Sequence, residues 1–158
     1  MTTSAEVWRR VLPMAVAGGM GFWVANLAIS LTPIAAEYRA ALSIPYVPML
    51  FEALLGGLVI ALGVSWILVR HPGVLPPGRR LAKSLYASAI ALIAVTVAIE
   101  IPSKFIANPA GSLRYFLVGA AFNAVRILVL GLVIGTLGQA RAGQDRGRRG
   151  HQPGTVLR

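Results

Sequence analysis

Four long apolar segments constrain what this chain can fold into. They run from about residue 11 to 31, 47 to 69, 84 to 101 and 115 to 137, and each is bounded by a charged residue, a proline or both. A bilayer core about 30 Å thick needs about 20 apolar residues at the rise of an α-helix. Strands of a membrane barrel are only about 10 residues long and alternate in polarity, unlike these segments. The sequence therefore predicts an all-α, polytopic membrane protein with a four-transmembrane-helix bundle over residues 11–138.

The composition separates this chain from soluble basic proteins. Its formal net charge is +10, yet only 13% of its residues are charged and 56% are hydrophobic. Soluble domains usually contain about 25% charged residues. A nucleic-acid-binding role is therefore disfavoured, and the expected partner is the lipid bilayer. The absence of cysteine from the sequence excludes a disulfide framework and a thiolate zinc site.

The distribution of lysine and arginine predicts the orientation of the four spans. With an even number of spans both termini lie on one side, and positive residues gather at the cytoplasmic ends of spans. Eleven of the 15 Lys and Arg residues fall on the side of the termini, against three on the other: Arg9, Arg10, Arg70, Arg79, Arg80, Lys83, Arg141, Arg146, Arg148, Arg149 and Arg158, against Arg39, Lys104 and Arg114. The sequence therefore predicts a cell-membrane protein with both termini in the cytoplasm.

The two ends of the chain raise separate questions. Residues 1–10 form a short cytoplasmic segment, and the apolar run after them is about 20 residues long with no small-x-small cleavage pattern at its outer end. We therefore expect a retained first helix and not a cleaved signal peptide. Residues 139–158 are polar, basic and rich in glycine, which predicts a disordered cytoplasmic tail. The tail either anchors the last helix at the membrane surface or binds a partner.

Small residues recur at four-residue spacing inside three of the spans. The second span has such a stripe, the fourth has a glycine pair and the first has an alanine–glycine pair: Ala53, Gly57, Ala61 and Ser65; Gly131 and Gly135; Ala15 and Gly19. In lipid, small residues let helices approach closely and pack. The pattern predicts a tight bundle or a homo-oligomer, without indicating an activity.

Five polar side chains fall within or at the edge of the apolar segments. They are Asn26, Glu52, Glu100, Asn123 and Arg126. A charged residue at a helix centre costs roughly 2.5–3.5 kcal/mol on insertion scales, so such residues often mark a binding or transport site. All five lie in the middle or the outer half of their spans. We therefore expect one polar site that opens outward, in which Glu52 pairs with Arg126.

Two alternatives to a functional polar site stay open. A buried pair of Glu52 and Arg126, flanked by two asparagines, can serve only to fix the register of the helices. Glu100 lies near the outer end of its span, where it can pair with Lys104 at the membrane surface.

The outer connections are apolar enough to lie at the membrane interface. Residues 32–48 contain Glu37, Tyr38 and Arg39, and residues 102–114 contain Lys104. Tyrosine and basic side chains are typical of the headgroup region. The two segments are predicted to act either as lids over an outward cavity or as anchors that fix the helix ends.

No catalytic motif selects a reaction. The two histidines, His71 and His151, fall in a cytoplasmic connection and in the tail, so we expect neither a metal site nor a cofactor. Transport or the binding of a lipidic or small-molecule ligand is the favoured interpretation. The alternatives are a membrane-embedded enzyme acting on a lipid or isoprenoid, and an accessory subunit of a membrane complex.

Overall fold

The computed structural model describes residues 4–102, 105 and 112–150, and these form five α-helices and no strand. The four long helices are α1 (Ser4–Ser30), α3 (Tyr46–Arg70), α4 (Arg80–Val95) and α5 (Ser112–Gly150), and α4 continues into a π-helical segment, η1 (Thr96–Glu100). A fifth, short helix is α2 (Pro33–Ala41). Four of the helical stretches are long and apolar enough to cross a membrane. The predicted all-helical architecture with four such helices is confirmed.

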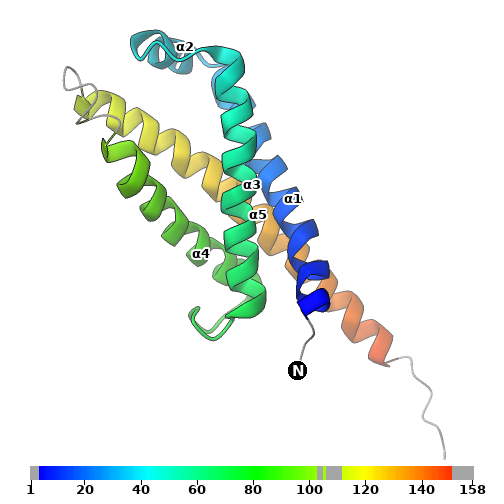
Figure 1. The fold of residues 1–158 in the computed structure, drawn as a ribbon. Helices are drawn as coiled ribbons and strands as arrows, with labels where there is room; N and C mark the ends of the chain where they lie inside the picture. The colour runs from blue at the N-terminus through cyan, green and yellow to red at the C-terminus, as the bar shows by residue number, and fades with distance from the viewer. Residues whose placement is uncertain (1–3, 103–104, 106–111, 151–158) are drawn as a thin grey trace, which may run out of the picture.

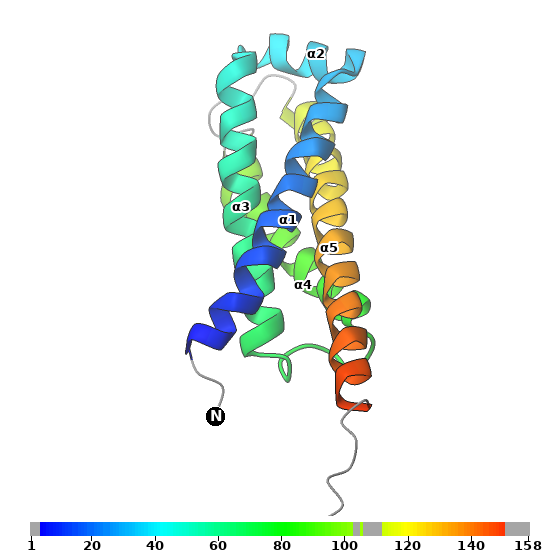
Figure 2. The same ribbon diagram turned by 90° about the vertical axis from the view of Figure 1, so that its right-hand side faces the viewer.

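The short helix α2 lies across one end of the bundle, here called the α2 end (Figures 1 and 2). The sequence explains where it begins, because Thr32 Oγ1 accepts a hydrogen bond from the Ala35 amide at 3.3 Å and Pro33 occupies the first turn. The opposite end, here called the N-terminal end, holds the start of α1, the end of α5 and the connection between α3 and α4.

Helix α1 is central to the packing, since it contacts both α3 and α5 extensively, while α4 packs mainly on α5. Trp23 Nε1 of α1 donates a hydrogen bond to the Leu50 carbonyl of α3 at 3.1 Å. Ser84 Oγ of α4 donates one to the Gly131 carbonyl of α5 at 2.7 Å. The largest fully buried apolar side chains, Val11, Val64, Ile127, Leu130 and Ile134, lie where these helices meet.

The small-residue stripes are used inside this one chain. A Cβ at Gly57 would lie 2.7 Å from Phe22 of α1, and a Cβ at Gly19 would lie 2.6 Å from Leu58 of α3. Gly131 and Gly135 likewise leave room for side chains of α4. The predicted close helix packing is therefore present within the monomer, where glycine lets neighbouring helices approach.

Two predicted boundaries differ from the structure. Helix α5 continues to Gly150, so residues 139–150, predicted to be disordered, are helical, and residues 151–158 lie outside the described residues. Extending an existing helix adds one hydrogen bond per residue without a new nucleus, and Ala, Gln and Arg are good helix formers. The third apolar stretch, predicted from 84 to 101, begins at Arg80 and ends in a π-helical turn.

Candidate functional site

The π-helical segment η1 turns Glu100 toward α5. Ser84 and Ser88 of α4 are buried and contact α5 next to Gly135 and Gly131. In an uninterrupted α-helix Glu100 would be turned about 160° from Ser84, because successive residues advance by about 100°. A π-helix makes a wider turn and shifts the residues that follow it, and such segments are frequent at functional sites. Glu100 is consequently buried, with an exposed fraction of 9%.

Glu100, Asn123 and Arg126 form a hydrogen-bonded chain, here called the Glu100–Asn123–Arg126 chain. Asn123 Nδ2 donates to Glu100 Oε1 at 2.8 Å, and Arg126 Nη1 donates to Asn123 Oδ1 at 3.1 Å. Asn123 and Arg126 lie three residues apart on α5, a spacing that places side chains on one face. The neutral amide thus links a carboxylate to a guanidinium through both of its polar atoms.

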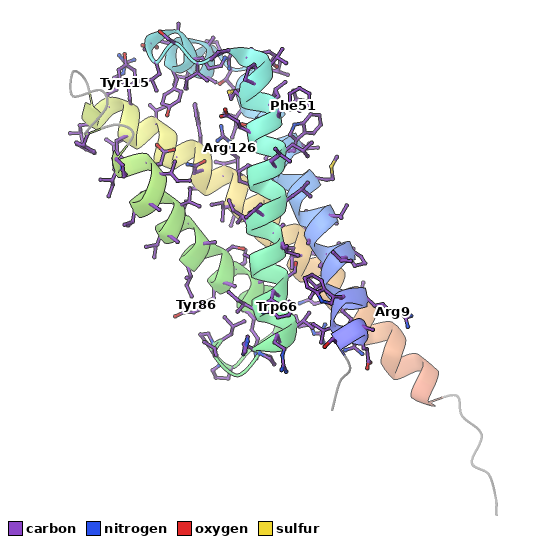
Figure 3. The ribbon with its side chains drawn as sticks, in the orientation of Figure 1. Arg9, Phe51, Trp66, Tyr86, Tyr115 and Arg126 are labelled. Carbon is purple, nitrogen blue, oxygen red and sulfur yellow. The ribbon has the colours of Figure 1, made fainter. Side chains whose placement is uncertain are left out.

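Aromatic side chains flank the Glu100–Asn123–Arg126 chain on the side that faces α2. The Tyr38 ring lies 5.7 Å from the Phe122 ring and 6.2 Å from the Tyr115 ring, both in edge-to-face arrangements. The guanidinium carbon of Arg126 lies 5.8 Å from the centroid of Phe122. In Figure 3, Arg126 lies deeper in the bundle and Tyr115 lies at the α2 end. The rings reduce contact with solvent and favour a positive charge over their faces.

The lack of a side chain at Gly119 leaves room for two oxygen atoms beside α5. A Cβ at this position would lie 2.6 Å from Glu100 Oε2 and 2.8 Å from the Tyr38 hydroxyl. The hydroxyl of α2 and the carboxylate of η1 therefore converge on a residue of α5 that lacks a side chain. The sequence predicts Tyr38 as an interface anchor, and the structure brings it to the polar site as well.

The predicted pair of Glu52 and Arg126 is not formed. Glu52 is exposed on α3, about 140° around the helix from Gly57, which packs on α1. Among the described residues neither a hydrogen bond nor an ion pair joins Glu52 to Arg126, and the guanidinium instead donates to Asn123. The prediction of the pair was wrong because depth along a helix does not specify which face a residue occupies.

Asn26 lies at the depth of the polar site but does not join the hydrogen-bonded chain. Gly21 of α1 lies against Val129 and Val133 of the antiparallel α5. Asn26, five residues after Gly21, therefore lies at the level of Arg126. Asn26 is fully buried, and neither atom of its amide has a hydrogen-bond partner among the described residues. Because most buried polar side chains are hydrogen-bonded, the Asn26 amide is a free donor and acceptor among the described residues.

The loop residues predicted at the interface make separate contacts. Glu37 of α2 forms an exposed ion pair with Arg114 of α5 at 2.6 Å. Arg39 donates a hydrogen bond to the Ser30 carbonyl at 3.0 Å and lies 5.0 Å from the centroid of Tyr46. Lys104 lies outside the described residues, and with it the alternative that it pairs with Glu100. These contacts fix α2 to the ends of α1 and α5.

The site therefore unites three of the five predicted polar residues, Glu100, Asn123 and Arg126, and leaves Asn26 and Glu52 apart from them. Gly119 and Phe122 were not predicted from the sequence, although Gly119 precedes Asn123 by four residues and Phe122 precedes Arg126 by four, a spacing that places each pair on one face of α5. No three His, Cys, Asp or Glu side chains gather among the described residues in a way that could hold a metal ion. A cavity beside Tyr38 and Glu37 measures only about 10 Å³.

Comparison with protein families, with curated proteins and with solved structures finds no match to this chain. The chemistry of its own residues is therefore the basis for assigning a function. That chemistry consists of one acid that can take up a proton, one permanent cation and one amide between them, held within helices whose outer surfaces are apolar.

Proposed function

We propose that the chain is an integral membrane protein whose four long helices cross the bilayer with the N-terminal end in the cytoplasm. Two features support this proposal. Large apolar side chains are exposed on the outer faces of all four helices, as with Val59 of α3 and Ile93 of α4. In addition, the Lys and Arg residues gather at the N-terminal end, as expected of the cytoplasmic side.

We propose further that the Glu100–Asn123–Arg126 chain is the working site of a small transporter or ligand-binding membrane protein. The observation that carries this proposal is the link from a buried carboxylate to a guanidinium through one amide, inside helices that are otherwise apolar. Ionisable groups at such depth are expensive and usually serve ions, protons or substrates. A structural pair would need only two residues in direct contact, whereas here an amide separates the charges.

The arrangement of donors and acceptors suggests how the site works. When Glu100 takes up a proton it loses its negative charge, and its attraction to the Asn123 amide weakens. Asn123 also holds Arg126, so the protonation of Glu100 changes how firmly the guanidinium is held. Arg126 can then bind an anionic group of a ligand, and the unpartnered amide of Asn26 at the same depth offers a further donor and acceptor. Binding of a small anionic or zwitterionic ligand is thereby coupled to a proton.

Replacing Glu100 with glutamine tests the proton-coupled site. In proteoliposomes that enclose a pH-sensitive dye, an imposed pH gradient is expected to drive proton uptake through the wild-type protein. Glu100→Gln should reduce this uptake by about tenfold or more, because glutamine cannot carry the proton of a membrane relay. Glu37→Gln is the matched control, since Glu37 is an exposed carboxylate whose surface ion pair contributes little.

Equal proton uptake by the wild type and Glu100→Gln would contradict proton-coupled transport. The ligand-binding form of the proposal has its own measurement, which is mass spectrometry of small molecules that copurify with the protein. A molecule retained by Glu37→Gln and lost from Arg126→Gln would support it. A lipid that is chemically altered during incubation with the protein would instead favour the membrane-embedded enzyme. The absence of both uptake and a specific ligand would favour an accessory subunit.

A further inference from the structure

A second, larger cavity lies at the N-terminal end, away from the Glu100–Asn123–Arg126 chain. Its volume is about 540 Å³, and residues of α1, α3, α4 and α5 line it. This volume falls within the range of about 300–1,000 Å³ that is typical of ligand sites. Four cationic side chains face it, against one carboxylate: Arg9, Arg10, Arg80 and Lys83, against Glu6.

The cations of this cavity are only partly neutralised. Arg10 pairs with Glu6 at 3.3 Å, one turn away on α1. Arg80 Nη1 donates to the Gly138 carbonyl at 3.1 Å, and Lys83 Nζ donates to the Pro72 carbonyl at 3.1 Å. Carbonyl oxygens orient these two side chains without cancelling their charges. Among the described residues Arg9 takes part in no ion pair, so the cavity carries an excess of positive charge that an anion would balance.

The inner wall of the cavity is apolar. Met14 of α1 and Ile134 of α5 belong to the buried core, and Leu68 and Val69 of α3 complete this side. The cavity therefore presents cations and a hydrocarbon wall to the same occupant. Such a surface suits an amphiphile whose charged group meets the cations and whose apolar part meets the wall.

Aromatic residues indicate the depth of the cavity. Trp8, next to Arg9 in the sequence, lies 5.2 Å from Trp66 of α3. Figure 3 shows Trp66, Tyr86 and Arg9 at the N-terminal end of the bundle. Tryptophan and tyrosine gather at the headgroup level of membranes, so the mouth of the cavity lies where lipid phosphates are found.

We infer that this cavity binds the phosphate-bearing headgroup of an anionic phospholipid of the cytoplasmic leaflet. The inference rests on the membrane insertion proposed above and is independent of the Glu100–Asn123–Arg126 chain. A soluble phosphate compound shares the anionic group but has no hydrocarbon part that would pack against the apolar wall. The excess of cations explains a preference for anionic over zwitterionic lipid, because each lysine or arginine near the headgroup strengthens binding about fivefold.

Native mass spectrometry of the full-length protein tests this inference. The protein is titrated with phosphatidylglycerol and, separately, with phosphatidylcholine of the same acyl chains. Phosphatidylglycerol is expected to bind about tenfold more tightly or better. Arg9→Gln/Lys83→Gln should weaken its binding by about twenty-fivefold, the product of two fivefold effects. Arg70→Gln/Arg79→Gln removes the same charge from exposed positions of the same end that do not line the cavity, and should change the affinity less than about twofold.

Three results would overturn the inference. Equal binding of the two lipids would show that the cavity does not recognise an anionic headgroup. Equal weakening by the two double variants would assign the effect to overall charge. Displacement of phosphatidylglycerol by inorganic phosphate at low millimolar concentration would identify a site for free phosphate.

Proton uptake in the liposome assay reports on Glu100 alone, so a failure of the lipid-binding inference is distinguishable from a failure of the proposed function. Melting temperatures of both double variants, expected to match that of the wild type, confirm that the comparison is between folded proteins.

Discussion

Replacing Asn123 with leucine is expected to lower the free energy of unfolding by about 3–5 kcal/mol, the range seen when a buried charge loses its partner. The amide of Asn123 is the shared partner of Glu100 and Arg126, with bonds of 2.8 and 3.1 Å. Leucine fits a similar space but can neither donate nor accept. The carboxylate and the guanidinium would each lose a bond at once, in surroundings that do not solvate them. Titration with sodium dodecyl sulfate in mixed micelles, followed by circular dichroism, measures the change.

Thr136→Val is the control for this substitution. Thr136 is an exposed polar residue on the same helix, and in the described part of the chain its hydroxyl bonds only to carbonyls of its own helix. Its replacement should change the free energy of unfolding by less than about 0.5 kcal/mol, as at other surface positions. A loss below about 1 kcal/mol for Asn123→Leu, close to that of an ordinary neutral hydrogen bond, would mean that Asn123 does not link two charges.

The second large effect is expected at the crossing of α1 and α3. A Cβ at Gly57 would lie 2.7 Å from Phe22 Cδ1 and 3.1 Å from Phe22 Cβ, and the second of these atoms cannot move without its backbone. Gly57→Val should therefore destabilise the protein by about 1–3 kcal/mol, the usual cost of overpacking. The same titration with sodium dodecyl sulfate measures this loss.

The neighbouring glycine gives a matched control. A Cβ at Gly56 would meet nothing within 4 Å, so Gly56→Val adds the same side chain without a clash. Valine is also a better helix former than glycine, and Gly56→Val is expected to be neutral or slightly stabilising. If both variants lost the same stability, the packing of Gly57 on Phe22 would be excluded as the cause. If Gly57→Val were neutral, the assigned crossing of α1 and α3 would be wrong.

The helices of this fold could be predicted from sequence because their signal is long and redundant. Each apolar segment is far longer than a strand, and prolines and charges mark its ends. The helix α2 was not predicted, because a helix of nine residues leaves only a short pattern in the sequence. The helical continuation of α5 past residue 138 was missed, because composition alone does not show that a helix already formed can be extended.

The polar site could be predicted in depth but not in pairing. Distance along a helix follows directly from residue number, and in the bundle Asn26 of α1 reaches the level of Arg126 of α5. The partner of Arg126 depended on rotation about the helix axis, which for Glu100 is altered by η1. A π-helical turn has no simple sequence signature, and in an uninterrupted α-helix Glu100 would lie about 160° around the helix from Ser84. The exposure of Glu52 could not be predicted either, because α3 is apolar on every side and its sequence does not show which face packs on the other helices.

One comparison tests the central claim most directly, namely that Arg126 works together with Glu100 through Asn123. It is a pair of double-mutant cycles in the free energy of unfolding, one for Glu100→Gln with Arg126→Gln and the other for Glu52→Gln with Arg126→Gln. Residues that share a partner couple by roughly 0.5–3 kcal/mol, whereas independent residues are additive within about 0.5 kcal/mol. The structure predicts a coupling of about 1–3 kcal/mol between Glu100 and Arg126 and additivity between Glu52 and Arg126. Additivity in the first cycle, or coupling in the second alone, would contradict the account.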